Sequence, residues 1–194
     1  MAVIDSRSAG VLPPLETPHL NPDDKLRKWL SQLTGLPLAS VRKRWQPKPG
    51  TRPSISDDWC AVGVERIESQ GIPQHVGRRG QLDHPESGDV VTVTHQTIVC
   101  LASFYGPNSM GLADRFREGA QIGQNVRELA KEGLLLQSIE ADVLHLPDFL
   151  MNQWVDRYEV RFAVGRVVER TYGVRSLASV GDIQIFIDKD KGTL

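Results

Sequence analysis

Hydrophobic and polar positions change their period several times along the 194-residue chain. The first regular stretch carries four apolar residues at the spacing of one helix face: Leu26, Trp29, Leu30 and Leu33. Asn21 and Pro22 stand where a helix cap and a first helical residue belong, and Gly35 follows the last apolar position. This pattern predicts a short helix between Asn21 and Gly35.

The middle of the chain combines β-like runs with one helical segment. From 90 to 105, apolar residues occupy both alternating rows, which predicts a central strand buried on both faces. From 59 to 67 the alternation begins apolar and ends in charge, so this strand is expected to run out of the core. Between 108 and 133, helical spacing interrupted at Gly119 and Gly123 predicts two short helices.

The C-terminal third is predicted to be mostly strand. Residues 134–146 favour a strand, and the prolyl turn at 146–148 favours a short helical turn. Clean alternation over 154–168 predicts a half-exposed antiparallel strand with Trp154 on its apolar face. Its polar row consists of Arg157, Glu159 and Arg161. Isoleucines at alternate positions over 183–187 predict a last short strand, and the glycines and prolines of 71–88 predict a loop or flap.

This order of elements predicts an α+β fold, a mostly antiparallel sheet with helices packed on one face. Pro47, Pro49 and Pro53 forbid a regular helix and interrupt a central strand. We therefore expect residues 1–53 to form an N-terminal tail, a short helix and an extended Pro-rich arm. Residues 54–194 are expected to form the α+β domain and its long loops.

Composition excludes several functional classes. The formal net charge of −1 excludes a protein that is basic as a whole and binds nucleic acid through that charge. No run of about 18 apolar residues occurs, and the N-terminus lacks the charged and apolar regions of a secretory signal. We therefore expect an intracellular product without membrane contact.

Chemistry-bearing residues are scattered. None of the five histidines forms a pair at metal-ligand spacing, and neither Cys60 nor Cys100 has a basic neighbour that would favour a thiolate. No nucleophile elbow and no phosphate-binding glycine motif occurs. We expect no catalytic residues, no metal site and no cofactor. The histidines, as ligands of a metal-dependent hydrolase, remain the weakest alternative: His19, His75, His84, His95 and His145.

The strongest candidate contact is the basic, Trp-containing segment 42–52. Basic residues beside an aromatic residue can bind nucleic-acid phosphates and stack a base, which leaves a small nucleic-acid-binding protein as the main alternative. Trp and Arg are also the commonest anchors of protein interfaces, and a net charge near zero favours this docking arm. The candidate interface residues are Arg42, Arg44, Trp45, Trp59, Arg157 and Arg161.

Four stretches carry a resemblance to a known family. They read VRKRWQPKPGTRPSISDDWCAVGV (41–64), QTIVCLASFYGPNS (96–109), REGAQIGQNVREL (117–129) and WVDRYEVRFAVGRVVERTYGV (154–174). Their order and spacing resemble phage neck and tail-terminator proteins, which are ring-forming structural parts of the virion. None of the four stretches is a catalytic signature.

The resemblance implies a ring, of hexameric number in the family, that terminates the tail tube and joins it to the head. Implied partners are further copies of the chain, other neck or connector proteins, the tail tube, and sheath or collar proteins. Double-stranded DNA would pass through the ring without sequence-specific contact. The protein would be assembled in the host cytoplasm and reside in the neck of the virion. The family's α+β layout agrees with the fold predicted above.

Overall fold

The computed structural model describes residues 6, 10–16, 21–46, 50–51, 53–78, 89–150 and 152–174. Its elements, in chain order, are α1 (Asp23–Thr34), a 3-10 turn (Leu38–Ser40), β1 (Val41–Lys43), β2 (Trp59–Arg78), β3 (Asp89–Tyr105), α2 (Ser109–Ala120), α3 (Gly123–Lys131), β4 (Leu135–Ile139), β5 (Leu144–His145), β6 (Asp148–Leu150), β7 (Gln153–Val155) and β8 (Arg157–Tyr172). The predicted helix near residue 22 and the predicted helix pair are confirmed as α1, α2 and α3.

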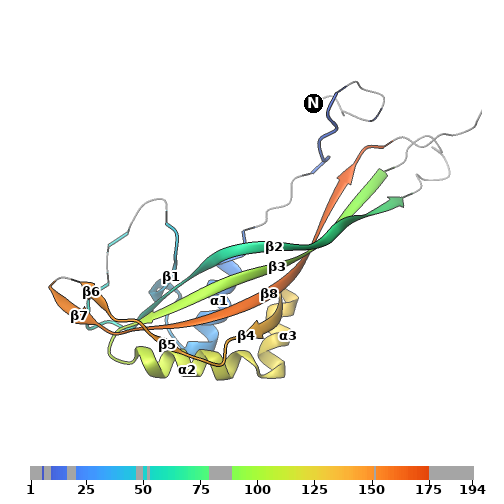
Figure 1. Ribbon diagram of the computed structural model, residues 1–194. Coiled ribbons are helices and arrows are strands. Elements are labelled where there is room, and N and C mark those ends of the chain that lie inside the picture. The colour runs from blue at the N-terminus through green and yellow to red at the C-terminus, as the bar shows by residue number, and fades with distance from the viewer. Residues whose placement is uncertain are drawn as a thin grey trace, which may run out of the picture. The chain divides into compact units, whose positions relative to one another are not determined.

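One mixed, mostly antiparallel sheet dominates the part of the chain that the structure describes. Its strands follow the order β1-β2-β3-β8-β4, and β5 also pairs with β8. β1 runs parallel to β2, whereas β4 and β5 run antiparallel to β8. All three helices lie on one face of this sheet (Figure 1). The predicted α+β class is therefore confirmed, with β3 as the central strand between β2 and β8.

The core lies between the helices and the sheet. α1 contributes Leu26, Trp29 and Leu30, all at most 4% exposed, as the helical spacing predicts. From β3, alternate residues point into the same core: Ile98, Cys100, Ala102 and Phe104. Fully burying each large apolar side chain contributes about 1.5–3 kcal/mol, so this layer is the main source of stability.

Four aromatic side chains form the centre of that core, and we call them the core aromatics: Trp29, Phe104, Phe116 and Phe162. The rings of Trp29 and Phe116 meet edge to face with centroids 5.7 Å apart. Phe116 also packs on Phe162 at 5.3 Å and on Phe104 at 5.9 Å. Edge-to-face pairs at such distances add to the stabilisation that burial alone provides.

The chain divides into two compact units. The larger contains residues 18–74 and 93–169 and holds the core described above. The other contains residues 1–17, 75–92 and 170–194, and in it the Leu15 amide donates to the Thr171 carbonyl. The expected division at residue 53 stays a prediction; α1, which falls in its first part, packs into the main core.

Three local predictions are wrong. Residues 71–78, expected to be a loop, continue strand β2, which includes Pro73 and Gly71 at a positive φ of 71°. Asp148 begins a strand instead of a helical turn. The expected strand over 154–168 is broken at Asp156 into β7 and β8. The short strand predicted over 183–187 lies outside the described residues, as do residues 79–88 of the expected flap.

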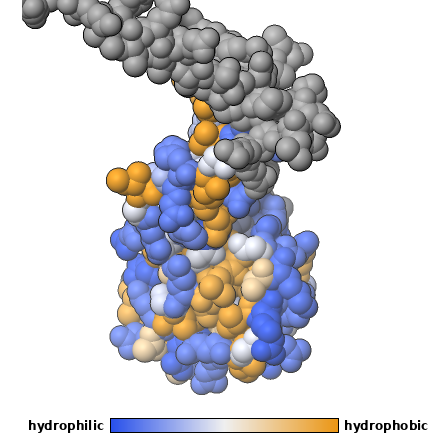
Figure 2. Space-filling model, turned by 90° about the vertical axis from the view of Figure 1, so that its right-hand side faces the viewer, coloured by the Kyte–Doolittle hydropathy of each residue, from blue (hydrophilic) through white to orange (hydrophobic). Residues whose placement is uncertain are grey.

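A shallow hollow of about 360 Å³ lies where α3 ends and β4 begins. Leu135 and Val167 line it, and each is about half exposed. Figure 2 shows this side, where apolar side chains gather in the middle with polar ones around them. No Trp, Tyr or Phe side chain occurs in the described lining of this hollow. No helix in the described part of the chain is long and apolar enough to span a membrane.

Candidate functional site

A cleft of about 570 Å³ lies at the β1 end of the sheet. We call it the aromatic cleft, after its principal lining residues: Arg42, Lys43, Arg44, Trp45, Trp59 and Tyr105. β1 supplies Arg42 and Lys43 by pairing with β2, so that Arg42 lies opposite Ala61, and Arg44 follows directly after the strand. The pairing extends past the strand, because the Arg44 amide donates to the Val62 carbonyl at 2.9 Å.

Gly63 allows the basic segment to lie directly on the sheet. A Cβ atom at this position would come within 2.8 Å of the Arg44 Cβ, which is closer than side chains approach. The Trp45 indole then reaches back across β2, and its Nε1 donates to the Val64 carbonyl at 3.3 Å. Trp45 nevertheless remains 67% exposed.

The cleft combines stacked rings with guanidinium groups. Trp59 and Tyr105 lie parallel, with ring centroids 4.1 Å apart and planes 4° apart. The Arg42 guanidinium lies 5.9 Å from the centroid of Trp59, and that of Arg44 lies 5.6 Å from Trp45. Distances below about 6 Å place both cations in range of attraction to the rings.

The three cations of the cleft differ in what they contact within the chain. Lys43 pairs with Asp24 at 2.9 Å, and the hydrogen bond from Lys43 is the main cause that lowers the pKa of Asp24. Arg44 donates to Ser103 and lies 3.7 Å from Glu159. Arg42 donates to the Thr51 carbonyl at 2.6 Å and has no carboxylate partner among the described residues. Among the described residues, no carboxylate lines the cleft, and its charged lining residues are all cations.

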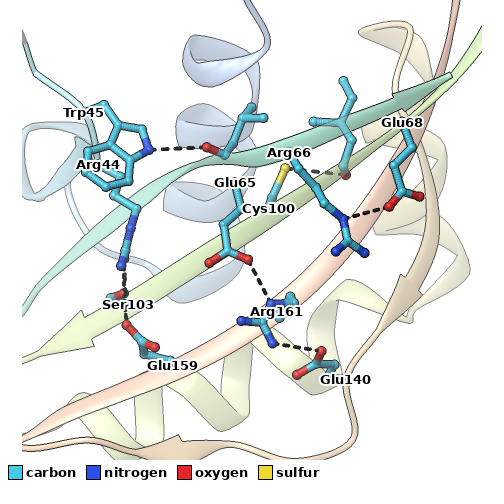
Figure 3. A network of polar contacts seen from close by, with 12 residues as sticks. Arg44, Trp45, Glu65, Arg66, Glu68, Cys100, Ser103, Glu140, Glu159 and Arg161 are labelled. Carbon is cyan, nitrogen blue, oxygen red and sulfur yellow. Dashed lines mark hydrogen bonds and ion pairs between the residues drawn. The ribbon is translucent and has the colours of Figure 1, made fainter.

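A buried carboxylate stands behind the cleft. Glu159 is only 7% exposed and accepts a hydrogen bond from Ser103 at 2.7 Å (Figure 3). It also lies close to two guanidinium groups. These groups belong to Arg44, at 3.7 Å, and to Arg157, at 3.5 Å. A buried charge requires such partners, because an unpaired one would carry a large desolvation penalty.

Arg157 connects the cleft to the neighbouring hairpin of β6 and β7. Its Nη1 donates to Asp148, the first residue of β6, at 2.8 Å. Burial raises the pKa of Tyr105, and a hydrogen bond with Arg157 opposes that rise. Glu159 therefore holds Arg44 on the cleft side and Arg157 on the hairpin side.

The hairpin presents two aromatic rings to solvent. Phe149 and Trp154 are paired across the two strands, with ring centroids 5.3 Å apart. They are 59% and 71% exposed. The turn between the strands includes Asn152 at a φ of 61°, a conformation that Asn tolerates better than most residues. At the other end, Asp156 contacts His145 at 2.9 Å.

The structure brings most of the predicted interface residues together. Arg42, Arg44, Trp45 and Trp59 line the one cleft. Arg157 lies behind it, through Glu159. Arg161 lies apart from the cleft and forms ion pairs with Glu65 and Glu140 at 2.8 and 3.3 Å (Figure 3).

Sequence reasoning missed Tyr105, Phe149 and the burial of Glu159. It also put Trp154 on the apolar face of one long strand, whereas the residue is 71% exposed on a separate hairpin. Asp156 could have indicated the break between the two strands, because Asp is a poor strand former and the alternating pattern starts again after it. Nothing in the local sequence marks Glu159 as buried, because its partners come from β1 and β3.

The other candidate groups remain dispersed. Burial raises the pKa of the Cys100 thiol to about 12 and raises that of Cys60 further. Among the described residues, no group of three or more His, Cys, Asp or Glu side chains comes together at metal-binding distance. His19 and His84 lie outside the described residues. The two carboxylates next to Trp59, those of Asp57 and Asp58, accept hydrogen bonds from nearby loop residues. Asp58, for example, accepts hydrogen bonds from Asn108.

A family model of known proteins matches most of the chain. No curated protein matches the chain. The family model of phage neck terminator proteins matches residues 24–190, which include α1 except its first residue, the aromatic cleft, the hairpin and every strand described here. The family is one of structural proteins and not of enzymes, which implies a place in the neck or tail of the virion and contact with other neck or tail proteins. The chain therefore belongs to the phage neck terminator protein family.

Proposed function

We propose that this protein forms a closed ring at the phage neck, where it terminates the tail tube and joins it to the head. The ring is a hexamer, the number that the resemblance implies. Family membership over residues 24–190 supports the neck location. The observation that carries the self-association is the exposed aromatic surface formed by the cleft and the hairpin, with Trp45 and Trp154 each more than 60% exposed.

An exposed group of large aromatic residues is unusual on a monomer and is typical of a surface that becomes covered. Trp and Arg provide much of the binding energy at protein interfaces, and the cleft contains both. In a cyclic ring each subunit contacts its two neighbours through different patches, so two distinct surfaces are required. We propose that Arg42, Arg44, Trp45 and Trp59 belong to one of them, and that Arg157 and Arg161 support these contacts from within the subunit.

The ring is tested by native mass spectrometry of the purified protein and by images of particles and of isolated necks. We expect closed rings, either of the protein alone or on tails, with the tail tube, connector, and sheath or collar proteins as neighbours. A protein that is strictly monomeric both alone and inside purified virions would contradict the proposal.

We further propose that double-stranded DNA passes through the ring with weak, sequence-independent contact. The chain has 23 Lys and Arg against 24 Asp and Glu, which leaves no excess of positive charge for phosphates. Lys43, Arg44, Arg157 and Arg161 also have carboxylate neighbours within the chain. Local clusters of cations would bind phosphates only weakly, and counterion release makes such binding fall steeply with salt.

A titration with duplexes of unrelated sequence, at low and at physiological salt, tests this part of the proposal. We expect binding only at low salt and equal affinity for all duplexes. Tight binding at physiological salt, with a preference for one sequence or for single strands, would instead favour a nucleic-acid-binding protein that uses residues 42–52.

A further inference from the structure

The hairpin of β6 and β7 is built as a protrusion. Each strand has three residues, and within the described chain the two pair only with each other. A two-stranded hairpin of this length is marginal by itself in water. Its rings, Phe149 and Trp154, contact each other but remain 59% and 71% exposed. The apolar area of the hairpin is therefore available for contact with another surface.

The aromatic cleft offers complementary chemistry. Its walls include the stacked pair Trp59 and Tyr105 and the exposed ring of Trp45, which suit an aromatic guest. Its cation Arg42 has no carboxylate partner among the residues that the structure describes. Asp148 and Asp156 both lie at the base of the hairpin, where Asp148 pairs with Arg157 and Asp156, whose side chain is 62% exposed, contacts His145. An aromatic protrusion with the exposed carboxylate of Asp156 at its base thus matches an aromatic cleft that contains the cation Arg42.

The protrusion does not occupy the cleft of its own subunit, since its rings are exposed and none of its residues lines the cleft. The same buried carboxylate orients both surfaces, because Glu159 holds Arg44 at the cleft and Arg157 at the base of the hairpin. A ring of identical subunits needs two different patches that fit each other, and the chain carries such a pair.

We propose that the β6–β7 hairpin of one copy of this chain inserts Phe149 and Trp154 into the aromatic cleft of the next copy, against Trp45 and Arg42. This inference rests on the proposed self-assembly and specifies the contact that produces it. The contact is heterologous, so each subunit donates one hairpin and receives another.

Variants that each disable one patch test the proposal directly. The hairpin variant carries Phe149→Ala and Trp154→Ala, and the cleft variant carries Trp45→Ala and Arg42→Ser. Because each variant lacks one of the two patches, neither forms rings alone. Each retains the patch that the other lacks. Mixed in equal amounts, with one carrying a mass tag, they form one-to-one dimers that do not grow. Ile122→Ala is the matched control, since that side chain is 57% exposed at the α2–α3 corner.

Engineered cysteines provide a second measurement that does not depend on removing aromatic side chains. Gln46 borders the cleft and Gln153 belongs to the hairpin, and both are exposed. Under mild oxidation, Gln46→Cys with Gln153→Cys should produce disulfide-linked multimers at no less than ten times the yield of Gln121→Cys with Gln153→Cys. The natural Cys60 and Cys100 are buried and do not compete.

The outcomes separate this contact from the proposed function. Rings of normal yield from both patch variants would overturn the hairpin contact and leave the ring intact. Loss of the ring in the cleft variant alone would assign the cleft to a different partner and would also overturn the hairpin contact. The absence of mixed dimers or of cross-linked multimers would overturn the hairpin contact as well. A wild-type chain that is monomeric alone and in virions would overturn the ring itself.

Discussion

Two groups of aromatic side chains in this chain differ sharply in their exposure to solvent. The core aromatics pack between the helices and the main sheet and are at most 4% exposed. The second group surrounds the cleft and the hairpin, where Trp45 and Trp154 are 67% and 71% exposed. The indole nitrogen of Trp29 donates to the Asn125 carbonyl, and its ring contacts Phe116 and Phe162. The indole nitrogen of Trp45 is also bonded, but most of its ring surface faces solvent.

The difference shows which part of the aromatic content stabilises the subunit. The core group is already in contact with apolar neighbours, so its burial contributes to folding. The surface group gains little from folding, and its apolar area remains available for association. A tryptophan whose ring is covered by its own subunit therefore contributes to stability. A tryptophan whose ring remains exposed is available for binding.

Phe116→Ala is expected to have the largest effect. Phe116 contacts three other core aromatics, and replacing it leaves a cavity in a fully buried site. Loss of a buried Phe side chain lowers the free energy of unfolding by about 3–5 kcal/mol. Chemical denaturation measures this value. Phe149→Ala, on the exposed hairpin, should cost less than about 1 kcal/mol, and an equal cost for both would abolish the distinction between the two groups.

Glu159→Gln should have the next largest effect. The amide retains an oxygen for Ser103 but removes the charge that faces Arg44 and Arg157. When a buried polar group loses its charged partner, the free energy of unfolding falls by about 1–3 kcal/mol.

Glu65→Gln is the matched control, because its pair with Arg161 is more exposed and such pairs contribute about 0–1 kcal/mol. Equal losses for the two substitutions would show that Glu159 is no more important than a surface ion pair. Ring yield should also fall in Glu159→Gln, because the cleft and the hairpin lose their common support.

Trp45→Ala should impair assembly more than folding. Removing an aromatic interface anchor costs about 2 kcal/mol or more in association, whereas an exposed residue with one hydrogen bond contributes about 1 kcal/mol to stability. Thermal melting of the subunit and incorporation into particles are measured together. If the melting temperature falls as far as in Phe104→Ala, whose ring is fully buried, Trp45 belongs functionally to the core.

The buried thiols should have the smallest effect near neutral pH. Burial raises the pKa of Cys100 to about 12, and that of Cys60 further, from an unfolded value near 9.0. Above pH 9 the unfolded chain loses thiol protons that the folded chain keeps, so stability falls with rising pH by up to about 1.4 kcal/mol per unit for each thiol.

Denaturation from pH 7 to pH 10.5 measures this slope, with Cys60→Ala and Cys100→Ala combined as the control. The double variant should show the shallower decline above pH 9. Rapid modification of the folded wild-type protein by a thiol reagent at pH 8 would show instead that the core is open.

Local patterns account for the helices and the central strand. Four apolar residues at helical spacing define the buried face of α1, and alternation on both faces identifies β3 as a central strand. Such patterns are readable because a helix or a strand buries a fixed face of its own residues. The same rule failed at Trp154, where Asp156 separates β7 from β8 and the alternation does not carry across.

The candidate site was predictable only in part. Arg42, Arg44 and Trp45 attract notice because basic and aromatic residues adjoin in a Pro-rich segment. Their association with Tyr105 and Glu159 depends on the parallel pairing of β1 with β2, which brings together residues more than fifty positions apart. No short-range pattern encodes such a pairing, because its hydrogen bonds join backbone groups of any residue type.

The sequence by itself determined the α+β class, the apolar faces that form the core and the membership of the neck terminator family over residues 24–190. Those features depend on periodicity and on ordered motifs, both of which are properties of neighbouring residues. Only the tertiary structure decided which tryptophans are buried and which are exposed, since exposure depends on what distant strands and helices cover. It also decided that a carboxylate in β8 lies behind an arginine of the arm, because burial of one charge requires another from elsewhere in the fold.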